Sequence, residues 1–169
     1  QSQPGIGFLT HEGPPRGLVI VCPGGAFLCK ADYEGLPVAE RFFNEGFNTA
    51  VLDYRVRPYG WDVSLADAQR AIRYVRRNTG KLNALPDKIA ILGFSAGGIL
   101  SGRAATIFDS GDPSAEDPVE RCSSRPDAAV ICYGAMSQAA FPGPVLSHNR
   151  MEQKAKVPLS PDAMVNVDC

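Results

Sequence analysis

The stretch that decides the fold is residues 88–98, KIAILGFSAGG, in which an apolar run passes directly into a glycine-rich turn. The run Lys88–Phe94 has the continuous apolar pattern of a strand buried on both faces, and Ala96–Phe108 is typical of a helix rich in small residues. The turn between them has the pattern G-x-S-x-G, with Ser95 at its centre. Such a turn is sharp and strained, and it holds the serine hydroxyl where a base and a substrate can both reach it. Ser95 is therefore the candidate nucleophile.

Two other interpretations of the Ser95 turn stay open: a plain structural strand-to-helix turn, and a glycine loop that binds phosphate. The phosphate interpretation lacks its residues. The sequence contains no G-x-x-x-x-G-K-[ST] string, and no G-x-G-x-x-G fingerprint follows its first buried strand.

Strands and helices alternate on both sides of this stretch. We predict strands at 6–10, 18–22, 47–54, 88–94 and 128–133, and helices at 36–43, 64–78 and 96–108. This alternation predicts the α/β fold class: a mostly parallel sheet of about five strands with helices on both faces. The loops that follow parallel strands share one edge of the sheet, so we look for the site there.

A second glycine-rich turn, Pro23–Phe27, follows the first buried strand. Acyl transfer needs backbone N–H groups aimed at the oxygen that becomes negative in the tetrahedral intermediate, and glycine lets the main chain approach a substrate closely. In a serine hydrolase one donor comes from the residue after the nucleophile, here Ala96, and others come from a loop of this kind, here Gly25 and Ala26. The alternative is a plain turn, which glycine also serves.

With these two motifs the chain resembles the α/β-hydrolase superfamily and, within it, the small esterases grouped with acetyl xylan esterases and hormone-sensitive-lipase-like enzymes. The resemblance spans Leu18 to Tyr133. Five blocks carry it in order: Pro23–Phe27, Val51–Arg55, Asp67–Ala71, Asp87–Gly98 and Arg125–Val130. It implies that Ser95 is the nucleophile and that Gly25, Ala26 and Ala96 form the oxyanion hole. It also implies short acyl esters as substrates, often acetyl groups on sugars, and neither metal nor organic cofactor.

A serine nucleophile needs a general base and an orienting carboxylate, which in this fold follow it in the order Asp or Glu, then His. The two histidines do not match this order well. His11 precedes the first buried strand, and His148 lies in 135–169, where no clear period exists. We interpret His148 as a solvated loop residue. We therefore expect one domain, 1–169, with an irregular tail at 135–169 and without the last strands of the hydrolase.

Three functions remain open on this basis. The first is a serine esterase acting on small-molecule or carbohydrate esters. The second is a catalytically incomplete fragment or a non-catalytic binding module. The third is a peptidase or lipase on the same scaffold. A sheet edge left unpaired by missing strands would also invite self-association.

Composition excludes several other classes of protein. The chain has 169 residues, 44% of them hydrophobic and 21% charged, with a net charge of −1, so we expect no nucleic-acid partner. No apolar run approaches the roughly 18 residues of a membrane span, so we expect no membrane partner. Five cysteines without a C-x-x-C pair argue against a disulfide framework or a zinc site. They favour the cytoplasm, with secretion after signal-peptide removal as the alternative.

Other conspicuous polar and aromatic residues have structural interpretations. We expect Asp53 and Arg55 to form a structural ion pair or anchor a loop, and Ser64 with Asp67 to start a helix. We expect a solvated basic helix face from Arg70, Arg73, Arg76 and Arg77. Tyr59 and Trp61 either wall a sugar-sized pocket or pack under their loop.

Overall fold

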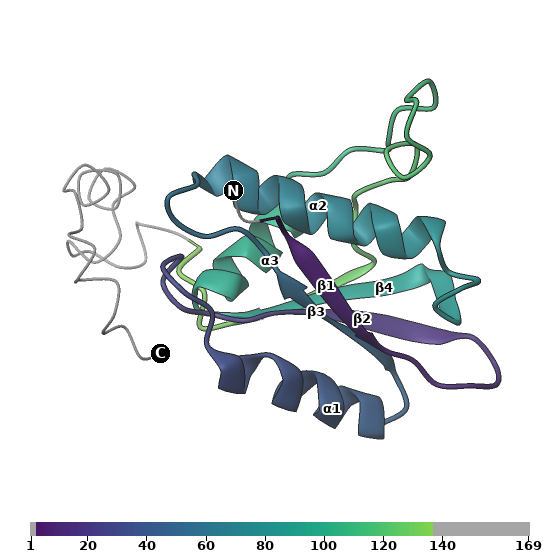
Figure 1. Ribbon diagram of the computed structural model, residues 1–169, viewed down its shortest axis with the longest axis horizontal. Coiled ribbons are helices and arrows are strands. Elements are labelled where there is room, and N and C mark those ends of the chain that lie inside the picture. Colours follow the sequence, from purple (N-terminus) through teal and green to yellow (C-terminus); the bar gives the residue numbers. More distant parts are fainter. Residues whose placement is uncertain (1–2, 137–169) are drawn as a thin grey trace.

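The computed structural model describes residues 3–136, which contain a sheet of five strands in the order β1-β3-β2-β4-β5 (Figure 1). Its strands are β1 (Gly5–Leu9), β2 (Arg16–Cys22), β3 (Asn48–Asp53), β4 (Ala84–Phe94) and β5 (Ala128–Cys132). Only the pairing of β1 with β3 is antiparallel, and β2, β3, β4 and β5 run parallel. The predicted mostly parallel sheet is therefore confirmed.

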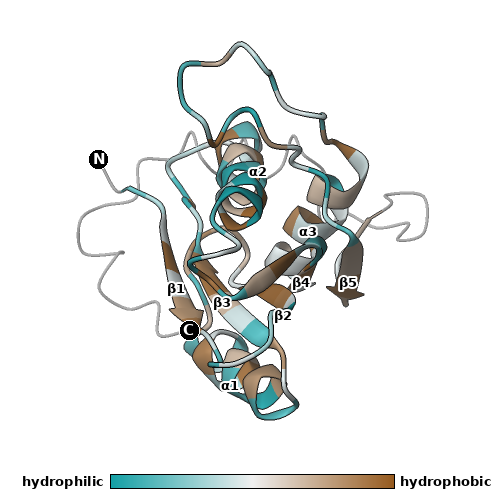
Figure 2. Ribbon diagram, turned by 90° about the vertical axis from the view of Figure 1, so that its right-hand side faces the viewer, coloured by the Kyte–Doolittle hydropathy of each residue, from teal (hydrophilic) through white to brown (hydrophobic). Residues whose placement is uncertain are grey.

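Helices lie on both faces of this sheet, as predicted (Figure 1, Figure 2). One face is covered by α1 (Leu36–Asn44), which a short 3-10 helix, η1 (Asp32–Glu34), precedes. The other face is covered by α2 (Trp61–Arg77) and α3 (Ala96–Thr106). The loops after β2, β4 and β5 meet at the carboxyl edge of the sheet.

Two hydrophobic cores follow from the alternation of side chains along the central strand β2. Leu18, Ile20 and Cys22 belong to the core beneath α2 and α3, and Val19 and Val21 belong to the core beneath α1. Figure 2 shows the apolar strands between these helix layers. A strand buried on both faces has the continuous apolar sequence from which β2 was predicted.

The expected start of the second helix is wrong. Helix α2 begins at Trp61 after Gly60, three residues before Ser64. The Ser64 hydroxyl donates to the Arg55 carbonyl over 2.6 Å, and the buried Asp67 carboxylate accepts from the Arg55 backbone N–H over 2.8 Å. Both side chains therefore anchor the chain after β3 to α2 instead of capping a helix.

The polar residues at the end of β3 form ion pairs with partners other than each other. Asp53 pairs with Lys30, and Arg55 pairs with Asp67 over 2.6 Å. Asp53 and Arg55 therefore have structural roles, as predicted, but they do not form an ion pair with each other.

The row of arginines on α2 is not the solvated face that the sequence suggested. Three of its members bind the loop 109–127, which crosses over this helix. Their ion-pair partners are Asp117 and Glu120 for Arg70, Asp109 and Glu120 for Arg73, and Asp127 for Arg76. Only Arg77 of the row is exposed without an ion pair to a described residue.

The cysteines of residues 3–136 differ in state. Cys22, Cys122 and Cys132 have free thiols, and burial raises the pKa of Cys22 to about 12. Cys29, unlike these three, does not have a free thiol. In this part of the chain, no helix has both the length and the apolar character needed to cross a membrane.

Candidate active site

Ser95 lies at the carboxyl end of β4, directly before the first residue of α3. Its backbone has φ 49° and ψ −112°, a strained conformation for any residue with a side chain. The Ser95 N–H donates to the Cys132 carbonyl at the end of β5 over 2.9 Å. Ser95 is exposed, whereas Gly93 and Ala96 on either side are buried. The turn therefore presents the Ser95 hydroxyl at the sheet edge.

The glycines of this turn are required by close packing. A Cβ atom at Gly93 would overlap the Gly97 carbonyl, and one at Gly97 would overlap the Cys22 carbonyl at the end of β2. The neighbouring atoms are backbone atoms, which cannot move aside as a flexible side chain can. The turn thus fits tightly against the start of the loop that follows β2.

The loop after β2, which contains the predicted oxyanion residues Gly25 and Ala26, approaches Ser95 at Gly24. An ideal Cβ at Gly24 would lie 3.2 Å from the Ser95 Cβ. The chain then turns through three successive positive φ values, 127° at Gly25, 54° at Ala26 and 57° at Phe27. Within residues 3–136, the N–H groups of Gly25 and Ala26 donate to no hydrogen-bond acceptor. Both N–H groups therefore lie without a described acceptor in the two residues that follow Gly24.

The N-terminus of α3 adds the third predicted donor. Ala96 is the first helical residue, and the first N–H groups of a helix have no partner within the helix. The positive end of the helix dipole favours negative charge at the same place. The structure therefore brings Ser95, Gly25, Ala26 and Ala96 together at one edge of the sheet.

Aromatic side chains pack against the loop after β2. Phe27 packs on Trp61 with 4.4 Å between ring centroids, and the Arg103 guanidinium lies 5.6 Å from the Trp61 ring centroid. The buried Tyr54 hydroxyl donates to the Pro23 carbonyl over 2.6 Å, and desolvation raises the pKa of this phenol well above its usual range. These contacts place Trp61, which is the first residue of α2 and not a loop residue as the sequence suggested, against the loop after β2.

Glu34 is a residue of this site that the sequence did not reveal. It lies in η1 and is only 8% exposed. Its Oε2 accepts from the Gly24 N–H over 2.8 Å, and its Oε1 accepts from the Tyr133 hydroxyl over 2.6 Å. The hydrogen bond to Glu34 raises the pKa of Tyr133 to about 12. No periodic pattern or motif marks Glu34, because both contacts join residues distant in sequence.

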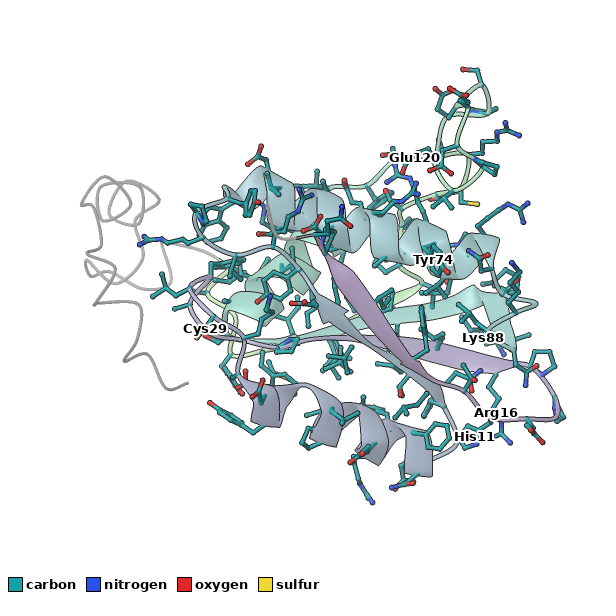
Figure 3. The ribbon with its side chains drawn as sticks, viewed as in Figure 1. His11, Arg16, Cys29, Tyr74, Lys88 and Glu120 are labelled. Atoms are coloured by element: carbon teal, nitrogen blue, oxygen red, sulfur yellow. The ribbon has the colours of Figure 1, made fainter. Side chains whose placement is uncertain are left out.

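The described histidine does not reach the serine. The His11 ring stacks on Phe43 at the end of α1, 3.8 Å between centroids, and its Nε2–H donates to the Phe43 carbonyl over 2.9 Å. Figure 3 shows His11 at the opposite end of the sheet from Cys29, whose N–H donates to the Gly25 carbonyl. His148 lies outside the described residues. Residues 3–136 also contain no group of three or more His, Cys, Asp or Glu able to hold a metal ion.

This arrangement defines the class of protein: a mostly parallel sheet with a serine on a strained turn between a central strand and a helix is the α/β-hydrolase fold. The model of the BD-FAE family matches residues 9–152, and the chain belongs to that family.

Known proteins with similar chains are hydrolases and esterases. An acetyl ester-xyloside bifunctional hydrolase from Caldicellulosiruptor lactoaceticus is 44% identical, with a TM-score of 0.79, over 82% of this chain and 51% of that one. The α/β hydrolase MGS-M1 from a deep-sea metagenome is 32% identical, with a TM-score of 0.58, over 72% of this chain and 45% of that one. Esterase LipC of Mycobacterium tuberculosis is 34% identical over 71% of this chain and 30% of LipC. This chain spans about half of the two solved structures and less than a third of LipC.

Proposed function

We propose that this chain carries the nucleophile and oxyanion hole of a serine esterase that cleaves short acyl esters. The observation that carries the proposal is the exposed, strained Ser95 beside a loop in which two N–H groups have no acceptor within residues 3–136. Acetyl groups on carbohydrate are the proposed substrates, which is supported by the acetyl ester-xyloside hydrolase that is 44% identical to this chain.

In the proposed reaction, Ser95 Oγ attacks the ester carbonyl carbon as its proton passes to a general base. The new C–O bond pushes the carbonyl electron pair onto oxygen, and this oxyanion accepts hydrogen bonds from Gly25, Ala26 and Ala96. Collapse of the intermediate breaks the bond to the alcohol, which takes up the proton. Water then releases the acyl group from Ser95 by the reverse sequence. The base must come from outside residues 3–136.

A second candidate, a binding module or a catalytically incomplete protein, is favoured by one observation. Among the described residues no histidine lies near Ser95. Without a base, the oxyanion hole and substrate binding alone leave an acceleration of only about 10³–10⁴-fold over the uncatalysed reaction.

Hydrolysis of p-nitrophenyl acetate by the 169-residue chain, beside Ser95→Ala, separates the two candidates. Ser114→Ala, at an exposed loop serine, is the matched control. The esterase proposal expects hydrolysis and fluorophosphonate labelling that are lost in Ser95→Ala and kept in the control. A wild-type rate equal to that of Ser95→Ala would instead favour the second candidate for this chain. Comparing an acetylated xylo-oligosaccharide with p-nitrophenyl octanoate then tests the substrate class.

A further inference from the structure

The Glu34 carboxylate joins two loops that stand on opposite sides of Ser95. Strand β4, which ends at the Ser95 turn, lies between β2 and β5 in the sheet. One oxygen of Glu34 binds Gly24 in the loop after β2, and the other binds Tyr133 directly after β5. Glu34 therefore ties together the two strand ends that flank the serine.

The bridge occupies one N–H group of the loop and leaves the next two without a described acceptor. Glu34 occupies the Gly24 N–H, and the Gly24 carbonyl accepts from Ala31 over 3.0 Å. The Gly25 carbonyl accepts from Leu28 over 2.9 Å. The next two N–H groups, those of Gly25 and Ala26, have no acceptor within residues 3–136.

Glycine at position 24 is part of the same arrangement. A Cβ atom there would lie 2.6 Å from Glu34 Oε2 and 2.9 Å from the Phe94 carbonyl. The absence of a side chain thus permits the short contact with the carboxylate and the close approach to the serine turn.

We propose that Glu34 is a positioning residue that, with Tyr133, holds the Gly25 and Ala26 N–H groups in the geometry of an oxyanion hole. This proposal rests on the proposed esterase function. Both oxygens of Glu34 accept hydrogen bonds from the loops, one from Gly24 and one from Tyr133, and we assign the carboxylate to holding these loops. Its effect reaches the reaction only through the loop that it fixes.

The test measures two properties of the 169-residue chain, wild type and variants. The first is the set of amide NMR signals of Gly24, Gly25 and Ala26, and the second is kcat and KM for p-nitrophenyl acetate. The variants are Glu34→Ala, Glu34→Gln and Tyr133→Phe, with Glu40→Ala as the control at an exposed glutamate of α1. Tyr133 is 70% exposed, so Tyr133→Phe probes the bridge without disturbing the core.

We expect Glu34→Ala to shift all three amide signals and to lower kcat at least about tenfold, with KM changed less than twofold, because displaced donors weaken transition-state binding. Glu34→Gln should keep most of kcat, since its amide can accept from Gly24 and donate to the Tyr133 oxygen. Tyr133→Phe should fall between these two variants, and Glu40→Ala should match wild type.

Unchanged Gly25 and Ala26 signals in folded Glu34→Ala, or a kcat equal to wild type, would overturn the proposal. If wild type hydrolyses no faster than Ser95→Ala, the esterase function fails for this chain, and the amide signals alone decide whether Glu34 positions the loop. The two failures are therefore distinguishable.

Discussion

Ser95 combines backbone strain with an exposed hydroxyl at a single residue. Its φ of 49° and ψ of −112° cost about 1–3 kcal/mol for a residue with a side chain. The hydrogen bond to Cys132 and the packing of Gly93 and Gly97 hold the residue there against this cost. The outcome of this strain is an exposed hydroxyl beside the loop after β2.

Replacement of Ser95 by glycine should therefore stabilise the protein while it removes the hydroxyl. Relief of strain is worth about 1–3 kcal/mol, and the greater unfolded-state freedom of glycine offsets about 0.4–1 kcal/mol of it. We expect the free energy of unfolding of Ser95→Gly to exceed that of Ser95→Ala by about 1 kcal/mol, since alanine keeps the strained Cβ. Urea denaturation measures the difference. A Ser95→Gly protein less stable than Ser95→Ala would show that this turn is not strained.

The sequence predicted the position of Ser95 and of the loop 23–27 because both turns are local, defined by glycines within a few residues. Glu34 could not be predicted in this way. Its partner Gly24 lies 10 residues away, and Tyr133 lies 99 residues away in the chain. A buried carboxylate that joins two loops is recognised only when the fold brings those loops together.

At the level of elements, α2 packs on the sheet with one face and binds the loop 109–127 with the other. The sequence of the helix predicts the first contact and not the second. Its apolar face, with Ala68, Ala71, Ile72 and Val75, packs on the sheet as the helical period predicts. Its polar side holds the loop 109–127 through arginines. A row of arginines has the same pattern whether solvent or an acidic loop covers it, which is why the sequence favoured the wrong choice.

Arg73 is the central residue of this contact, because its side chain is 10% exposed and binds both Asp109 and the Cys122 carbonyl. We expect Arg73→Gln to lower the free energy of unfolding at pH 7 by about 1–2 kcal/mol. The estimate stays small because solvent screens the half-exposed Asp109. Arg77→Gln, the matched control at an exposed position of the same helix, should change it by less than about 0.5 kcal/mol.

Asp109 determines how the difference in free energy of unfolding between wild type and Arg73→Gln depends on pH. Burial alone would raise the pKa of Asp109, but hydrogen bonds from Arg73 and Gly111 hold it below its ordinary value. A lowered folded-state pKa contributes stability above the unfolded-state pKa, about 3.9, and this stability is lost as the pH falls through the folded-state pKa. The difference in free energy of unfolding between wild type and Arg73→Gln should therefore become smaller below about pH 4. A gap equally large at pH 7 and pH 3 would contradict this role of Asp109.

At the scale of the whole molecule, the described sheet ends in an apolar edge. Strand β5 pairs with β4 on one side only within residues 3–136. The Ile131 side chain points toward α3, because its Cδ1 lies 3.2 Å from an ideal Cβ at Gly102. Side chains alternate along a strand, so Val130 points to the other face, where it is 45% exposed. An open edge with exposed β-branched residues favours pairing with a second chain.

We therefore predict that the 169-residue chain self-associates through β5 and that Val130→Lys weakens this association. A lysine on an edge strand opposes pairing because its charge would have to be desolvated. Leu36→Lys is the matched control, because Leu36 on α1 is a similarly exposed apolar residue, 52% against 45% for Val130. Light scattering over a range of concentrations should show a rising mass for wild type and Leu36→Lys, and a monomer for Val130→Lys. Equal association of wild type and Val130→Lys would place the contact elsewhere, since the substitution changes the edge without changing the side of β5 that packs on α3.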